Sequence, residues 1–201
     1  MKNPTSGRGQ RGFSLIEMLV VMALMLILLT LGIPSLLNAL HQSKMRGMVQ
    51  EITVAMRLAR IDAIKTSSRG IVQIVPSAGP GSLPLVRAFS DRDSNGKLTA
   101  GEPVLASFVL PTGVSFEDNT GKVDKDSVYG FSSDPEGGPS MAIFLPDGSI
   151  LDFGSFHISD TYGNHLEVNV ETKATVRIAV RKFESGEWVS NGDKGKAWTW
   201  N

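Results

Sequence analysis

A single long apolar segment near the N-terminus constrains this 201-residue chain more than any other feature. Every residue from Met18 to Leu29 is apolar, and only four residues between Phe13 and Ile33 are polar or glycine. As an α-helix, this segment covers the roughly 30 Å hydrocarbon core of a bilayer. Three basic residues and no acidic residue precede it. The sequence therefore predicts one membrane-spanning helix, with a cytoplasmic N-terminus and the rest of the chain on the other side.

Glu17 is the one charged residue within this apolar segment. A carboxylate in a spanning helix costs on the order of 2.5–3.5 kcal/mol when central and less near an interface, so it is interpreted as functional. Cleavage between Gly12 and Phe13 would create an ammonium at Phe13, four residues from Glu17. In a bundle of such helices, the Glu17 carboxylate of one subunit could pair with the Phe13 ammonium of its neighbour. The sequence therefore predicts that this helix promotes polymerisation.

The segment Gly12-Phe13-Ser14-Leu15-Ile16-Glu17 resembles the class III signal of type IV pilins and type II secretion pseudopilins. An ordinary signal anchor would share the apolar run but would match these positions only by accident. The resemblance implies that residues 1–12 are a leader cleaved after Gly12, that Phe13 is N-methylated and that Glu17 guides assembly. Pro34 predicts a helix kink. The resemblance favours a flexible point there that helps the subunit to pack into a filament.

Composition places the remainder of the chain in a soluble domain outside the cytoplasm. The chain has 20 basic and 20 acidic residues, and removal of the three basic leader residues leaves 17 basic against 20 acidic. This balance argues against a globally basic nucleic-acid binder. Cysteine is absent, which excludes disulfides, thiolate nucleophiles and cysteine metal ligands.

Apolar spacings of three, four and seven residues predict that the helix continues past the membrane as an amphipathic helix. The predicted stripe comprises Leu36, Leu37, Leu40, Met45, Met48, Val49, Ile52, Met56, Ala59 and Ile64. Near its end, small Ala59 and Ala63 would let a sheet approach closely. The segment from Leu58 to Lys65 resembles the helix end of the GspH/FimT branch of the pilin family.

Short apolar or alternating runs after Gly70 predict strands separated by turns. The predicted strands are residues 71–75, 85–89, 104–110, 114–116, 141–145, 150–153, 165–170 and 175–182. The predicted fold is α+β and pilin-like, with a long N-terminal helix packed on antiparallel sheet. The predicted organisation is a leader at 1–12, a transmembrane and filament-core helix at 13–40, and a periplasmic or extracellular globular domain at 41–201.

The segment from Asp91 to Glu102 fits the calcium-loop pattern D-x-[DN]-x-[DN]-G-x5-E at every specified position. The calcium ligands would be Asp91, Asp93, Asn95, the Lys97 carbonyl and Glu102. Strands rather than helices are predicted on both sides, which differs from an EF-hand. Two interpretations stay open: a Ca²⁺ site, or an acidic hairpin that only shapes a turn, since Arg92 and Lys97 reduce the local negative charge.

Basic and aromatic residues are interleaved in the last third of the chain, as in surfaces that contact nucleic-acid backbone and bases. Arg177, Arg181 and Lys182 are the candidate DNA-binding residues. Alternatively, these basic residues are simply the solvent-facing side of an ordinary strand. The acidic residues near them in the sequence also argue against a DNA-binding surface. The three histidines lack metal-ligand spacing, and no nucleophile-elbow or phosphate-loop motif is present. We therefore expect no enzyme activity.

Taken together, the resemblance implies a minor pseudopilin or minor pilin of the GspH/FimT branch. We expect assembly into a type II secretion pseudopilus; the alternative is a FimT-like minor type IV pilin that binds DNA in natural transformation. Implied partners are other pilins or pseudopilins, a prepilin peptidase and an inner-membrane assembly platform. The expected location is the inner membrane, as a single-pass protein with a periplasmic globular domain, and then the filament.

Overall fold

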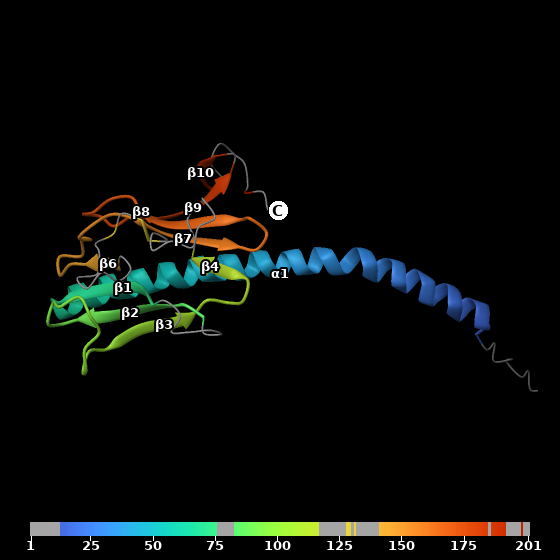
Figure 1. Ribbon diagram of the computed structural model, residues 1–201, viewed down its shortest axis with the longest axis horizontal. Coiled ribbons are helices and arrows are strands. Elements are labelled where there is room, and N and C mark those ends of the chain that lie inside the picture. Colours follow the sequence, from blue (N-terminus) through green and yellow to red (C-terminus); the bar gives the residue numbers. More distant parts are fainter. Residues whose placement is uncertain are drawn as a thin grey trace, which may run out of the picture. The chain divides into compact units, whose positions relative to one another are not determined.

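The computed structural model describes residues 13–75, 83–116, 128–129, 131, 141–184, 186–191 and 198. Over these residues the chain forms one long helix, α1 (Leu15–Thr66), followed by ten strands (Figure 1). The chain divides into two compact units, Met1–Leu40 and His41–Asn201, and the second is called the globular unit below.

Helix α1 starts directly after Ser14, whose carbonyl oxygen accepts hydrogen bonds from the backbone N–H groups of Glu17 and Met18. It ends at Thr66, and Ser67 then adopts a left-handed backbone conformation with φ of 52° that breaks the helical repeat. Lys65 lies in the last turn, where the helix dipole favours a cation.

The apolar stripe predicted from Leu36 to Ile64 is buried only from Met45 to Ala59, since Leu36, Leu37 and Leu40 are exposed. The buried members are Met45, Met48, Val49, Ile52, Met56 and Ala59. Ile64 was predicted to join them and does not, because its side chain is 51% exposed. Ala63 is fully buried and takes the inward position in this last turn, so the next residue points away from the core.

The globular unit contains two antiparallel sheets. Sheet A has the order β3-β2-β1-β6, formed by β1 (Arg69–Val75), β2 (Leu85–Asp91), β3 (Val104–Val109) and β6 (Met141–Phe144). Sheet B has the order β10-β9-β8-β7-β4, with β5 also paired to β7. Its strands are β4 (Val114–Phe116), β5 (Val128–Tyr129), β7 (Ser155–Asp160), β8 (His165–Val170), β9 (Ile178–Glu184) and β10 (Glu187–Ser190). These elements confirm the predicted α+β arrangement of a long helix on antiparallel sheet.

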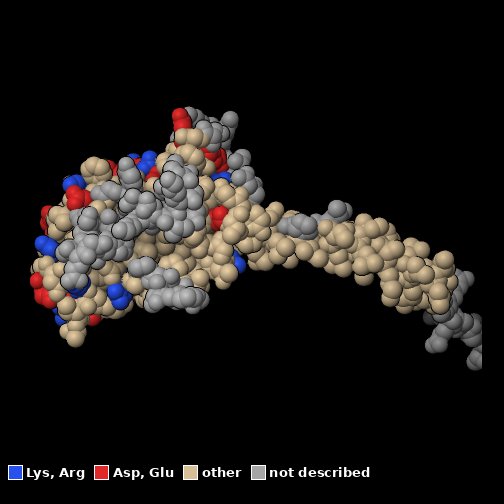
Figure 2. Space-filling model, in the orientation of Figure 1, with Lys and Arg blue, Asp and Glu red and all other residues tan. Residues whose placement is uncertain are grey.

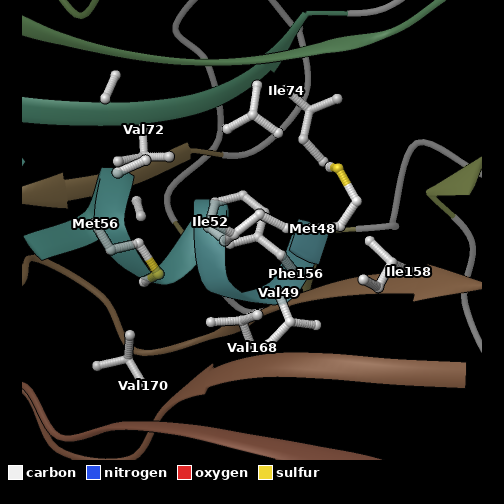
Figure 3. Close-up of a cluster of buried hydrophobic side chains, with 14 of the residues drawn as sticks. Met48, Val49, Ile52, Met56, Val72, Ile74, Phe156, Ile158, Val168 and Val170 are labelled. Carbon is white, nitrogen blue, oxygen red and sulfur yellow. The ribbon is translucent and has the colours of Figure 1, made fainter. Parts of the chain in front are cut away.

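Both sheets pack on α1 and share one apolar core (Figure 3). Alternate residues of the strands point to the helix, as the period of two in a strand requires. Figure 3 shows Val72 and Ile74 of sheet A on one side, and Phe156, Ile158, Val168 and Val170 of sheet B on the other, around Met48, Val49, Ile52 and Met56. Each such buried side chain contributes about 1.5–3 kcal/mol to burial energy. The helix is therefore the centre of the domain core.

Two strand predictions need correction, and three strands were not predicted. Residues 150–153 form no strand, because a turn stabilised by Asp147 precedes them and only an isolated bridge joins Ile150 to Phe144. Strand β9 begins at Ile178 rather than at residue 175, since Val176 has a φ of 50° and breaks the extended chain. Strands β5, β7 and β10 were not predicted.

Candidate functional site

The apolar half of α1 is the first candidate site, because it offers surface that the described chain does not bury. The helix is long and apolar enough to cross a membrane, and its most apolar window has no buried residues. Phe13 is 75% exposed, and Glu17 is also exposed in the first turn of α1. Figure 2 shows mostly uncharged atoms along this segment. Such a surface needs lipid or other helices around it.

Ser14 and Glu17 lie at the spacing of a helix-capping box, three residues apart at the start of α1. A carboxylate in the first turn is also favoured by the positive end of the helix dipole. Glu17 therefore has a local structural role available in addition to the predicted role in assembly. The two roles differ chemically, because capping is possible with glutamine and ion pairing is not.

A shallow apolar groove runs along one face of the same helix segment. It is lined by Met25, Leu28, Leu29, Gly32, Ile33 and Leu36. A Cβ atom built on Gly32 would meet nothing within 4 Å, so the groove has room there for a side chain of another helix. Pro34 lies in the same stretch, and α1 is helical throughout it. The kink at Pro34 stays a prediction.

The second candidate site is the loop between β2 and β3. Carboxylate oxygens of Asp91, Asp93 and Glu102 all lie within 4.8 Å of one another. Asp91 is the last residue of β2 and is fully buried, while the other two acids lie in the loop that follows. The strands on both sides confirm that this loop sits in a β-hairpin rather than between helices.

Hydrogen bonds from the backbone fold this loop around its acidic side chains. Asp91 accepts from the N–H groups of Asn95 and Gly96, at 3.0 and 3.2 Å. The side chain of Asn95 donates to Asp93 Oδ2 at 2.7 Å, and Asn95 Oδ1 accepts from the Lys97 N–H at 2.7 Å. The predicted ligand residues thus come together in one small loop.

Glu102 closes the loop with both carboxylate oxygens. Its Oε1 accepts from the Arg92 N–H at 2.7 Å and its Oε2 from the Thr99 N–H at 2.9 Å. Burial favours the neutral acid, but these backbone donors outweigh that effect and lower the pKa of Glu102. Its ionised form therefore stabilises the fold above the ordinary glutamate range, and this contribution is lost as the pH falls.

The pKa of Asp91 shifts in the opposite direction. Burial raises it most, and the neighbouring Asp93 and Glu102 raise it further, against hydrogen bonds from Gly96 and Asn95 that lower it. Folding therefore favours the protonated acid, so the contribution of Asp91 to stability is present at low pH and is lost as the pH rises. Converging carboxylates of this kind are a site where a divalent cation would relieve repulsion.

The three predicted DNA-contacting residues do not form one common basic face. Arg181 and Lys182 are neighbours in β9 and so point to opposite sides of sheet B. Lys182 is 3% exposed, and its Nζ lies 3.2 Å from a Glu184 carboxylate oxygen. Each arginine is also ion-paired: Arg177 Nε lies 3.2 Å from Glu171 Oε2, and Arg181 Nε lies 2.6 Å from Glu167 Oε1.

Sheet B carries a cross-strand row of polar residues in which His157 and Glu167 are buried and Arg181 is partly buried. Cross-strand register places His157, Glu167 and Arg181 opposite one another on β7, β8 and β9. His157 Nε2 is 2.9 Å from Ser155 Oγ and 3.3 Å from Glu167 Oε2, and its ring lies beside Trp188 with centroids 5.0 Å apart. The alternation of Phe156 and Ile158 was the one available signal for β7. These contacts link β7, β8 and β9 through polar side chains on one face of sheet B.

Comparison with known proteins gives one finding. Residues 7–33 match the family model of the prokaryotic N-terminal methylation motif. No curated protein and no solved structure matches the chain. The match confirms the predicted prepilin-type signal at the level of the motif. The individual roles of Gly12, Phe13 and Glu17 stay predictions, and so does the GspH/FimT branch. The chain therefore carries the N-terminal methylation motif of type IV pilin-like precursors, which indicates a pilin or pseudopilin subunit.

Proposed function

We propose that the chain is a minor pseudopilin, of the GspH/FimT kind, that assembles into the pseudopilus of a type II secretion system. The observation that carries this proposal is the methylation motif at the start of α1, followed by apolar side chains that are exposed as far as Leu40. A bilayer covers this surface before assembly, and neighbouring helices cover it afterwards. The role is mechanical rather than catalytic.

Assembly follows from the chemistry of the processed terminus. A prepilin peptidase removes residues 1–12, and the new amino group of Phe13 is methylated. The carboxylate of Glu17 then pairs with the Phe13 ammonium of a neighbouring subunit among apolar helices, where leaving either charge unpaired is costly. An inner-membrane assembly platform adds the subunit to other pilins or pseudopilins, and the globular unit lies in the periplasm.

The alternative is a minor type IV pilin that binds DNA. The ion pairs of Arg177 with Glu171 and of Arg181 with Glu167 reduce the positive charge available to phosphates, and so favour the secretion role. We expect residues 41–201 to show no salt-dependent binding to double-stranded DNA in a titration at several salt concentrations. Binding that weakens steeply with salt and disappears in Arg177→Ala would instead favour the DNA receptor.

A second proposal concerns the loop from Asp91 to Glu102, which we propose takes Ca²⁺. The convergence of three carboxylates on one point, in a loop that fits the full calcium pattern, is the observation that favours it. The ion would be held by oxygens of Asp91, Asp93, Asn95 and Glu102, with the Lys97 carbonyl. Its role would be to fasten the β2–β3 hairpin of sheet A.

We expect Ca²⁺ to raise the melting temperature of residues 41–201. At one hundred times its dissociation constant, the ion stabilises the fold by about 2.7 kcal/mol. The effect should vanish in Glu102→Gln and persist in Asp147→Asn, a control whose exposed carboxylate accepts hydrogen bonds from Ser149 and lies outside this loop. Because the pKa of Asp91 is raised, Ca²⁺ affinity should weaken on acidification before an ordinary aspartate would protonate. Equal melting temperatures with Ca²⁺ and with a chelator would contradict the proposal.

A further inference from the structure

The outward face of α1 in the globular unit carries an apolar stripe that the described residues leave exposed. Val54, Leu58 and Ile61 are 51, 40 and 59% exposed. They follow one another at spacings of four and three residues, so they lie along one side of the helix. The opposite side of the same segment fills the core between the two sheets (Figure 3). The helix is therefore apolar on two faces, and the described residues of the domain bury one of them.

Charged residues lie along both sides of this stripe. Those on one side are basic, and those on the other side are acidic. Arg46 and Arg57 lie on one side, and Glu51 and Asp62 lie on the other. Each like-charged pair is separated by eleven residues, which is close to three helical turns, so both members stay on the same side. Lys44 lies on the acidic side, seven residues before Glu51, and Lys65 follows Leu58 by seven residues and so continues the line of the stripe at its C-terminal end. Between Arg46 and Asp62, a basic border and an acidic border thus run along the two edges of the apolar stripe.

This arrangement is complementary to itself in one orientation only. When two identical helices meet face to face and parallel, the basic border of each faces the acidic border of the other, as charged border positions do in parallel coiled coils. When they meet antiparallel, basic faces basic and acidic faces acidic. A membrane helix inserted with the same orientation in every copy imposes the parallel arrangement. Gly47 lies near the start of the stripe, and a Cβ there would meet nothing within 4 Å, which allows a close approach.

We propose that two copies of this chain form a parallel pair through the outward stripe of α1, defined as Val54, Leu58 and Ile61. Arg57 of each copy faces Asp62 of the other, and Arg46 faces Glu51, five residues further along in both cases. The proposal rests on the proposed function only in taking the membrane anchor as the cause of the parallel orientation. The pair joins the subunits by a two-fold contact in the periplasmic half of the helix, separate from the contact of Glu17 with Phe13.

Absence of cysteine from the chain makes this contact directly testable. Val54→Cys and Leu58→Cys are introduced singly into the full-length protein in membranes, which are then treated with a mild oxidant. Parallel pairing in register brings identical positions together, so we expect disulfide-linked dimers for both variants. Thr161→Cys, at an exposed turn position away from the stripe, is the matched control and should yield few dimers. Equal dimer yields for Val54→Cys and Thr161→Cys would overturn the proposal.

A charge reversal tests the orientation independently. In the Val54→Cys background, Arg57→Glu places an acidic residue opposite Asp62 of the other copy, and this happens at both symmetric positions of the pair. The repulsion should lower the dimer yield about fivefold to tenfold. Adding Asp62→Arg restores opposite charges and should restore the yield. Restoration also shows that the single variant was folded. A double variant that stays as low as Arg57→Glu would reject the pairing of Arg57 with Asp62.

Failure of this proposal and failure of the proposed function give different results. If the chain is processed at Gly12 and enters filaments, but Val54→Cys yields no excess of dimers, the two-fold contact is wrong and the filament role stands. If Val54→Cys forms strong dimers in a chain that is never processed, the contact is right and the filament role fails. Crosslinks of Val54→Cys exclusively to a different protein would also reject pairing between copies.

Discussion

Gly70→Ala is expected to destabilise the globular unit by about 3 kcal/mol or more. Strand β1 crosses α1 so closely at Gly70 that a Cβ atom there would overlap the carbonyl oxygen of Ala59 and lie 2.7 Å from its carbonyl carbon. The obstacle is helix backbone, which cannot rotate away as a side chain can. A close approach of a sheet to Ala59 and Ala63 was predicted from the sequence. In the structure, the strand residue at this approach is Gly70.

Urea unfolding of residues 41–201 measures this effect, with Gly47→Ala as the matched control. Gly47 lies in α1, and an added Cβ would meet nothing within 4 Å. The control should be neutral or more stable by about 0.5–1 kcal/mol, because alanine loses less backbone entropy in a helix. A loss below about 1 kcal/mol for Gly70→Ala would mean that β1 and α1 can separate, contrary to the packing described above.

Glu17→Ala is expected to abolish most incorporation into filaments while leaving membrane insertion intact. Removing one partner of a poorly solvated ion pair costs about 3–5 kcal/mol, which corresponds to more than a hundredfold in association. Insertion should not suffer, because the substitution removes a charge from an apolar helix. The amount of the chain in sheared filaments, relative to that in membranes, measures the effect.

Glu17→Gln separates assembly from helix capping. Glutamine can still serve at the third position of a capping box with Ser14, but it cannot pair as an anion with the Phe13 ammonium. We therefore expect Glu17→Gln to be as defective as Glu17→Ala, and Glu17→Asp to keep part of the activity. Normal incorporation of Glu17→Gln would indicate that Glu17 acts in helix capping. It would also reject the proposed ion pair between the Glu17 carboxylate and the Phe13 ammonium.

Features that depend on short sequence spacing were predictable from the chain alone. The apolar helix, its signal around Gly12 and Phe13, and the inward stripe from Met45 to Ala59 follow from local composition and helical period. The folded loop from Asp91 to Glu102 likewise follows from a motif of twelve consecutive residues. In each case neighbouring residues determine the structure, so no knowledge of distant contacts is required.

Features that depend on register between distant strands were not predictable. Arg181 pairs with Glu167 because β8 and β9 align these two residues. A basic residue that looks like a DNA-binding candidate in the sequence is therefore an ion-pair partner within the sheet. Strand β7 was missed because its alternate positions, such as His157 and Ser159, are polar and yet buried on the outer face of sheet B. The bend at Val176 arises from a left-handed backbone conformation that a β-branched residue rarely adopts.

The most direct test of the filament role is the mass of the N-terminal peptide of the chain purified from membranes of a host with a prepilin peptidase. The account predicts a peptide that begins at Phe13 and carries the mass of one added methyl group. The Gly12→Val variant, purified in parallel, should keep residues 1–12 and remain unmethylated. A wild-type chain that retains its leader, or one cut at a position other than Gly12, would contradict the account.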